Sequence, residues 1–319
     1  MLNKKRLTLM RSGIAALISI TVISLSACCF FGGQSSSLSS APSSVPSSAG
    51  SLLEVHIIDV GNADAILVYN RDDSLLIDAG ENDDGDDVVN FLRSHGVKSL
   101  DYAIATHPDA DHIGGMDTVI EEIPIETFIM SDLPENIIPK TKTYRDLMAA
   151  LDSKDLNITP ARAGDSHPLG DAVLNILGPT GVFNSTNSMS VVCRIDHGIR
   201  RFLFMGDAEK DAEDVLMASK ADLKADFIKI GHHGSRSSSQ EKFIKAVDPQ
   251  YAAISCGGKN RYKHPHAQTL ELLSFLEIVY YRTDIFGTIA LVSDGSYIKF
   301  NTEKNQPPST YTNLNYKSR

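Results

Sequence analysis

The segment "THPDADHIGG", residues 106–115, places two histidines and two aspartates within six positions, directly after an apolar run. Ionisable side chains are costly to bury unless they are paired or bound to a metal. Imidazole and carboxylate together suit zinc, and a set richer in carboxylate suits manganese. His107, Asp109, Asp111 and His112 therefore predict a divalent metal site. On a tight loop, the first two would face one ion and the last two a second.

An acidic helix N-terminus is the alternative interpretation of this segment. Asp109 or Asp111 would then cap the helix that follows, where a carboxylate is stabilising. Capping explains the acids but leaves the two histidines unexplained, so the metal site is preferred.

Two later segments deliver the same residue types after apolar strands. "RRFLFMGDAEKD" ends in Asp207, and "LKADFIKIGHHGS" ends in His232 and His233. His264 and His266 follow in "KHPH", so six of the ten histidines fall in three clusters. Because sites in α/β folds collect at strand ends, these segments are expected to form one site.

Donor side chains surround the late histidines and could bind phosphate oxygens. A solvated loop is the alternative for each cation. The predicted substrate-binding group near His264 consists of Ser235, Arg236, Lys259, Arg261 and Lys263.

Apolar runs and amphipathic stretches interleave without a strict βαβ rhythm, which favours a mixed sandwich with helices outside. The first three strands suggest an antiparallel opening. Strands are predicted over 52–60, 63–69, 74–80, 101–107, 126–131, 173–177, 189–196, 201–206, 225–230, 250–255, 287–292 and 296–301. Helices are predicted over 86–95, 113–122, 140–151, 208–218, 239–247 and 267–276.

The N-terminus has the pattern of a secretion signal. A positive region is followed by an apolar run over 13–25 and the sequence "LSAC". This ending resembles the lipobox of bacterial lipoproteins, so residues 1–27 are predicted to be removed and Cys28 to carry lipid. An uncleaved anchor is the alternative. Either way the domain is expected at the extracytoplasmic face of the cell membrane.

Residues 28–51 are rich in Ser, Pro, Gly and Ala and predict a flexible tether. A metal-binding domain is expected over 52–302, with a polar tail over 303–319. Loss of the signal removes four cations and no acid, which moves the formal net charge from −10 to −14. This acidity argues against broad nonspecific nucleic-acid binding, although a local basic patch could still engage phosphate.

Two cysteines lie in apolar strand-like runs, Cys193 in "SVVCRI" and Cys256 in "YAAISC". Buried free thiols are the default interpretation. A disulfide between them is the alternative outside the cell.

Taken in order, "DVGNADAILV", "LIDAG", "THPDADHIGG", "FLFMGDA", "GHHGS" and "KHPH" resemble the metallo-β-lactamase superfamily. The similarity is greatest to the hydrolase domain of ComEC-type DNA-uptake competence proteins and covers residues 52–300. The resemblance implies an αββα sandwich with a metal site at one edge. It implies that Asp78 supports the site, that Asp207 bridges two ions, and that His232 or His233 is the late histidine ligand.

The sequence departs from the superfamily pattern at two places. Most members have a histidine where Asp109 stands, while the competence subgroup often has Asp, which leaves zinc or manganese open. The usual histidine before the Gly-Asp strand has no clear counterpart, because His167 and His197 are expected in surface turns. "NSMSVVCRIDHG" resembles the segment at this position and makes Asn187 and Ser190 site-lining residues.

A two-ion site favours phosphoryl transfer, because ions about 3.5–4 Å apart can hold the attacking and leaving oxygens. Asp111 would position or deprotonate the water, and Asp207 would hold the ions together. The predicted activity is phosphodiester hydrolysis, either of nucleic acid such as DNA or of a phosphate-bearing envelope polymer. No apolar run of spanning length follows the signal, so DNA transport by this chain is not expected.

Three alternatives to this activity remain. A phosphorylcholine esterase would need an aromatic cage, and the chain has no tryptophan. Hydrolysis of a β-lactam or another carbonyl substrate fits the subgroup less well. A non-catalytic metal-binding or polymer-binding lipoprotein is consistent with the gap in the ligand set. No obligate protein partner is evident.

Overall fold

The computed structural model describes residues 51–305. The predicted signal peptide with Cys28, the tether up to residue 50, and the tail from residue 306 lie outside the described residues. Ser51, the last residue of the predicted tether, already contacts the domain through hydrogen bonds from its N–H and hydroxyl to Asp171, at 3.0 and 2.6 Å. Among the helices of residues 51–305, none has the length and apolar character that a bilayer span requires.

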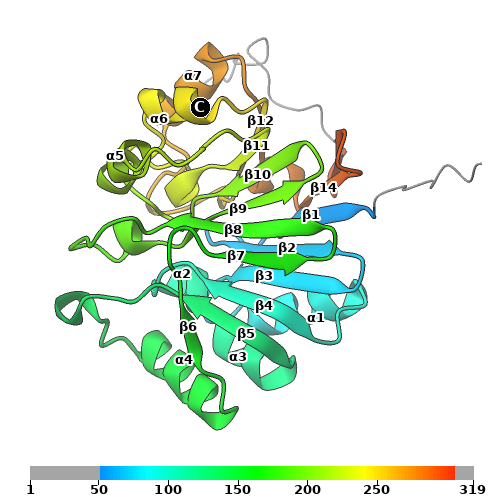
Figure 1. Cartoon of the computed structure of the whole chain (residues 1–319), viewed down its shortest axis with the longest axis vertical. Coiled ribbons are helices and arrows are strands. Elements are labelled where there is room, and N and C mark those ends of the chain that lie inside the picture. Colours follow the sequence, from blue (N-terminus) through cyan, green and yellow to red (C-terminus); the bar gives the residue numbers. More distant parts are fainter. Residues whose placement is uncertain (1–50, 306–319) are drawn as a thin grey trace, which may run out of the picture. The chain divides into compact units, whose positions relative to one another are not determined.

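The first sheet has eight strands in the order β15-β14-β1-β2-β3-β4-β5-β6 (Figure 1). The predicted antiparallel opening is confirmed, since β1 pairs antiparallel with β2 and β2 with β3, and the strands from β3 to β6 are parallel. The strands of this sheet are β1 (Leu53–Ile57), β2 (Ala65–Asn70), β3 (Asp73–Ala79), β4 (Leu100–Ala105), β5 (Ile125–Met130), β6 (Ile158–Pro160), β14 (Ile289–Ser293) and β15 (Ile298–Thr302).

The second sheet has seven strands in the order β13-β12-β11-β10-β9-β8-β7. An antiparallel meander from β7 to β10 continues into four parallel strands, β10 to β13. Its strands are β7 (Ser166–Leu169), β8 (Ala172–Gly178), β9 (Val192–His197), β10 (Arg200–Phe204), β11 (Phe227–Lys229), β12 (Tyr251–Ile254) and β13 (Val279–Arg282).

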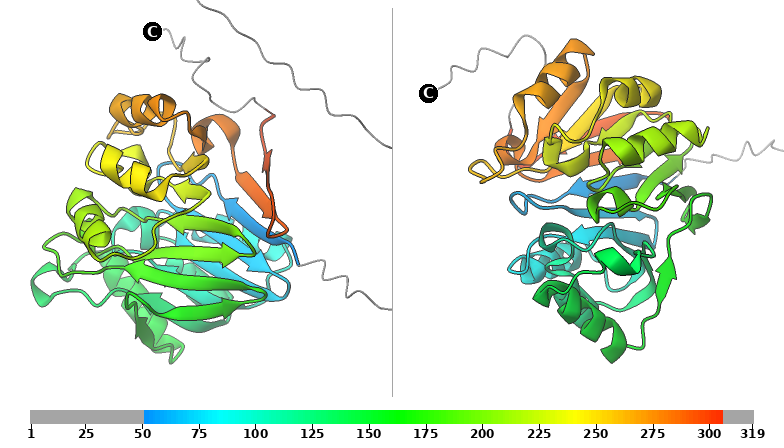
Figure 2. Two further views of the ribbon diagram at one scale, coloured as in Figure 1. Left: turned by 45° about the horizontal axis from the view of Figure 1, so that its top comes forward. Right: turned by 90° about the vertical axis from the view of Figure 1, so that its left-hand side faces the viewer.

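Helices cover the outer face of each sheet, so four layers form the predicted αββα sandwich (Figure 2). On the first sheet lie α1 (Gly85–Ser94), α2 (Ala110–Ile113), α3 (Met116–Glu122) and α4 (Lys142–Ser153). On the second lie α5 (Lys210–Ala218), α6 (Glu241–Val247) and α7 (Ala267–Phe275), and the short α8 (Thr283–Phe286) follows β13.

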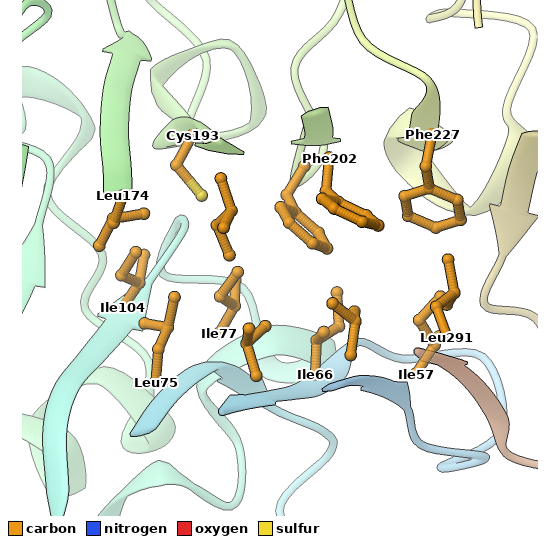
Figure 3. Close-up of a cluster of buried hydrophobic side chains, with 14 of the residues drawn as sticks. Ile57, Ile66, Leu75, Ile77, Ile104, Leu174, Cys193, Phe202, Phe227 and Leu291 are labelled. Carbon is orange, nitrogen blue, oxygen red and sulfur yellow. The ribbon is translucent and has the colours of Figure 1, made fainter. Parts of the chain in front are cut away.

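Strand side chains alternate between two cores. In β3, Leu75 and Ile77 face the layer between the sheets, which Figure 3 shows, whereas Leu76 faces the helices. A strand buried on both faces therefore has the continuous apolar sequence that predicted it. Cys193 lies in the central core and Cys256 in the outer core of the second sheet. Both thiols are free, which confirms the default interpretation.

Some elements differ from the sequence prediction. The predicted helix over 113–122 is divided at Gly114 and Gly115 into α2 and α3. β6, β7 and β13 were not predicted, because they are three or four residues long and partly polar. His167 and His197 lie on strands, so the expected surface turns are wrong. His197 is 3% exposed and its ring lies 3.5 Å from an Asp171 oxygen, which makes it a structural residue.

Candidate metal centre

The polar cluster forms where four strands end. β3 ends beside Asp78, β4 leads into His107, β10 leads into Asp207, and β11 leads into His232 and His233. The last two lie in a 3-10 turn, Gly231–Gly234, and both have left-handed backbones, with φ of +50° and +51°. Such conformations cost energy in non-glycine residues and are concentrated at functional sites.

Gly206 allows Asp207 to reach the cluster. Its φ is +50°, and an added Cβ would lie 2.9 Å from the Thr106 side chain and 3.0 Å from that of Ser190. A larger residue would therefore separate β10 from β4. The Asp207 N–H donates to the Ser190 hydroxyl at 3.0 Å, so Ser190 fixes the backbone that carries Asp207.

Asp78 orients the His112 ring through its Nδ1 atom. Its carboxylate accepts from the Thr106 N–H at 2.8 Å and hydroxyl at 2.7 Å, and lies 2.7 Å from His112 Nδ1. A carboxylate at one imidazole nitrogen fixes the tautomer and leaves the other nitrogen free to bind a metal. This arrangement fits the supporting role that the resemblance implies for Asp78.

The two oxygens of Asp207 face different histidines. Oδ1 lies 3.2 Å from His112 Nε2 and 3.6 Å from His233 Nε2. Oδ2 lies 3.6 Å from His232 Nε2 and 3.9 Å from His107 Nε2. Asp207 is 3% exposed and stands at the centre of the cluster.

Two further carboxylates flank the histidines, one on each side. Asp111 Oδ2 lies 3.5 Å from His233 Nε2, and Asp109 Oδ2 lies 3.8 Å from His107 Nε2. Thr186 donates to the other oxygen of Asp109 at 3.1 Å.

The donor atoms fit divalent ions. Two ligands of one tetrahedral ion at about 2.1 Å lie roughly 3.4 Å apart. His112 Nε2 and His233 Nε2 are 3.2 Å apart, and one ligand atom each from Asp111, His112 and His233 lie within 4.8 Å of one another, as do those of His107, His112 and Asp207. The buried Nε2 of His107 has no hydrogen-bond partner among residues 51–305. The chemistry and spacing of these atoms are those of a metal site.

Electrostatics favour a metal-binding protonation state for several of these groups. Burial lowers the pKa of His107 to about 4, so its ring is neutral at neutral pH. Burial alone would raise the pKa of Asp207, but the His112 and His233 imidazoles hold it well below the usual carboxyl range. Burial alone would likewise raise the pKa of Asp111. His233 and His112 outweigh this effect and lower the pKa to about 2.

A cavity of about 240 Å³ opens above the cluster. Of the predicted substrate-binding residues, Asn187 and His264 line it. Burial, with His232 and His233 nearby, lowers the pKa of His264 to about 4. Among residues 51–305, the lining consists of Asn62, Asp109, Asp111, Asn187, Asp207, His232, His233, Tyr262 and His264.

The other predicted substrate-binding residues lie outside this lining. Ser190 is buried under Asp207, and the hydroxyl of buried Ser235 pairs with that of Ser237 at 2.9 Å. The predicted cations Arg236, Lys259, Arg261 and Lys263 are all exposed.

Sequence reasoning missed several residues of the site. Asn62 and Tyr262 line the cavity, and Glu209 lies 3.3 Å from His232 Nδ1. A buried ion pair joins Lys229 and Asp64 at 2.9 Å, with side chains 0% and 2% exposed. The signal for this pair was available, because each is a lone charge inside an apolar run, Lys229 in "FIKI" and Asp64 in "ADAILV".

The fold and the His/Asp cluster are those of a metal-dependent hydrolase. The sequence pattern of the Metallo-beta-lactamase superfamily matches residues 58–258, so the chain belongs to that superfamily.

Among individual relatives, ComE operon protein 3 of Bacillus subtilis is 32% identical over 255 residues, which are 74% of this chain and 32% of that protein. Recombination protein 2 of Haemophilus influenzae is 28% identical over 242 residues, 74% of this chain and 28% of that protein. The chain thus spans about a third of the length of the curated relatives it matches. These relatives confirm the competence-type resemblance.

A solved structure, the CmlA beta-hydroxylase E377D mutant, covers 75% of this chain and 53% of its own, with a TM-score of 0.50 and 12% identity. It shares the fold.

Proposed function

We propose that the chain is a metal-dependent phosphodiesterase that acts outside the cytoplasm on nucleic acid or on a phosphate-containing envelope polymer. The observation that supports this most is the position of Asp207, whose two oxygens each lie between two imidazole nitrogens. A carboxylate so placed is suited to bridge two divalent ions, zinc or manganese, and two-ion sites are suited to phosphoryl transfer.

Divalent ions held by the His/Asp cluster around Asp207 would supply charge stabilisation for phosphoryl oxygens and would lower the pKa of a water molecule. Asp111, which lines the cavity with its side chain 23% exposed, would position or deprotonate the attacking water. Asn187 and the neutral His264 ring line the same cavity and can donate hydrogen bonds to phosphate oxygens. The exposed Arg236 and Lys263 attract a polyanion to an otherwise acidic domain.

The proposal includes a lipid anchor at Cys28 and a location at the cell membrane. The support is the N-terminal sequence, with its positive region, apolar run and "LSAC". The membrane is the one partner proposed besides the substrate.

A phosphorylcholine esterase activity has less support. Recognition of a quaternary ammonium uses aromatic faces. Apart from histidines, Tyr262 is the single aromatic residue that residues 51–305 contribute to the cavity lining, and the chain contains no tryptophan.

Hydrolysis of bis-p-nitrophenyl phosphate by the purified protein, with and without manganese or zinc, tests the proposal. We expect metal-dependent turnover that falls to background in Asp207→Asn. Asp214→Asn is the control, because Asp214 is a half-exposed carboxylate on α5 that pairs with Lys242 at 2.7 Å. Absence of turnover by metal-loaded wild type on this ester and on single-stranded DNA and teichoic acid would contradict it and favour a binding protein.

A further inference from the structure

The two adjacent histidines of the Gly231–Gly234 turn face different sides of the cluster. Their rings are nearly perpendicular, at 80°, with centroids 6.3 Å apart. His233 Nε2 lies near Asp207 Oδ1 and His232 Nε2 near Asp207 Oδ2, each at 3.6 Å. The left-handed backbone at both residues is what allows consecutive side chains to approach one carboxylate from two directions.

The ligand sets on the two sides are unequal without His232. On one side, Asp111, His112 and His233 accompany Asp207 Oδ1, which makes four donors. On the other side, His107 and Asp109 accompany Oδ2, which makes three.

Ser190, a predicted site-lining residue in the segment before the Gly-Asp strand, does not complete the second set. Its hydroxyl accepts from the Asp207 N–H at 3.0 Å, and Ser190 is 1% exposed and absent from the cavity lining.

We propose that His232 binds the ion on the His107 side through Nε2, so that each histidine of the pair serves a different ion. His232, in the turn after β11, then takes the place of the histidine that is missing before the Gly-Asp strand. This inference rests on the two-ion site of the proposed function.

The surroundings of His232 Nδ1 support this role. Glu209 Oε1 lies 3.3 Å from that nitrogen and the Ser237 hydroxyl 3.2 Å from it. Metal-binding histidines are typically held in this way, with an acceptor at the nitrogen remote from the ion. The other three cluster histidines show the same pattern: His107 Nδ1 with Thr106 Oγ1 at 3.2 Å, His112 Nδ1 with Asp78 Oδ2 at 2.7 Å, and His233 Nδ1 with the Ser255 carbonyl at 3.1 Å.

Metal binding to the purified protein tests the inference without reference to activity. Manganese and zinc are titrated by calorimetry, ions per chain are counted after gel filtration, and the manganese form is followed by electron paramagnetic resonance. His232→Asn is chosen because asparagine tolerates a left-handed backbone. We expect two ions in wild type, one in His232→Asn, and loss of the signal of a coupled manganese pair.

Glu209→Gln provides a second variant that leaves the turn itself unchanged. It keeps the size of the side chain and removes its charge, and we expect one of the two ions to bind about 10- to 100-fold more weakly. His95→Asn is the matched control, because His95 is exposed at the end of α1, and it should bind two ions as wild type does.

The outcomes separate this inference from the proposed function. A wild type that binds no divalent ion overturns both. A wild type that binds two ions, with two ions also bound at unchanged affinity in His232→Asn and Glu209→Gln, overturns the inference alone. Loss of activity in His232→Asn at unchanged metal content likewise overturns it, because His232 would then act on the substrate.

Discussion

Replacing Lys229 by methionine should destabilise the protein far more than the loss of a surface lysine. The ammonium lies 2.9 Å from both oxygens of Asp64, and neither side chain is more than 2% exposed. Lys229→Met leaves the Asp64 carboxylate buried without its cation, which costs about 3–5 kcal/mol. For a domain of this size, about 2–4 °C of melting temperature corresponds to each kcal/mol, so the midpoint should fall by about 6–20 °C.

Replacing Asp64 as well as Lys229 tests whether the unpaired charge is the cause of the loss. In Lys229→Met/Asp64→Val neither charge of this pair is left buried, and replacing a buried pair by apolar residues is often neutral. The double variant should therefore recover most of the lost stability, and urea unfolding of all four proteins should give a coupling free energy of several kcal/mol.

Lys224→Met serves as the control, because Lys224 and Asp248 form an exposed pair whose loss should cost less than about 1 kcal/mol. If the losses in free energy of unfolding of the two single variants simply add in the double variant, an unpaired buried charge is refuted as the cause of the destabilisation in Lys229→Met.

Three further predictions concern metal, pH and the anchor. Chelation of divalent ions should lower the melting midpoint, because Asp109, Asp111 and Asp207 then repel one another and the stabilisation by bound ions, about 2.7 kcal/mol at 100 times the dissociation constant, is lost; identical midpoints with and without chelator would exclude a metal site. Burial raises the pKa of Glu213 from 4.5 to about 7, so the folded state binds the Glu213 proton more tightly than the unfolded state. The resulting contribution to the free energy of unfolding, roughly 3 kcal/mol, is complete below pH 4.5 and is lost as the pH rises through 7. Relative to Glu213→Gln, wild type should lose stability between pH 5 and 7 in urea titrations, and parallel profiles would contradict this. Cys28→Ala should release the protein from the membrane fraction, and unchanged retention with an intact N-terminus would count against a lipid anchor.

Much of the metal centre could be predicted because its residues are close in sequence. His107 and His112 belong to one short segment between β4 and the end of α2, and strand ends were the expected place for Asp207. What could not be predicted is which distant groups meet. The contact of the Glu209 carboxylate with His232 depends on how the layers pack, which local patterns do not encode, and the supporting role of Asp78 at His112 was indicated by the family resemblance alone.

The errors of prediction have the same origin. Ser190 was expected to line the site, but packing against Gly206 directs its hydroxyl to a backbone N–H. His197 was expected in a surface turn, but it ends β9 and is covered, with its ring beside Asp171. Short edge strands such as β7 have too few residues for the alternation of apolar side chains to be recognised.

The pairing of β1 with β14 and of β14 with β15 brings the first and last strands of the domain within two positions of each other in one sheet. At about 4.8 Å per strand, the lateral separation is only about 10 Å. Because β1 and β15 are parallel, Leu53 lies level with Ile298, and the end of β15 at Thr302 lies about 13 Å further along the strand. A linker that spans roughly 16 Å could join the two ends, and new ends could be opened at an exposed loop such as the one at Asp155. Such a circular permutant would preserve every strand pairing around Asp207. The geometry of the metal centre therefore does not depend on where the chain termini lie, and the domain is suited to insertion into or fusion with another protein.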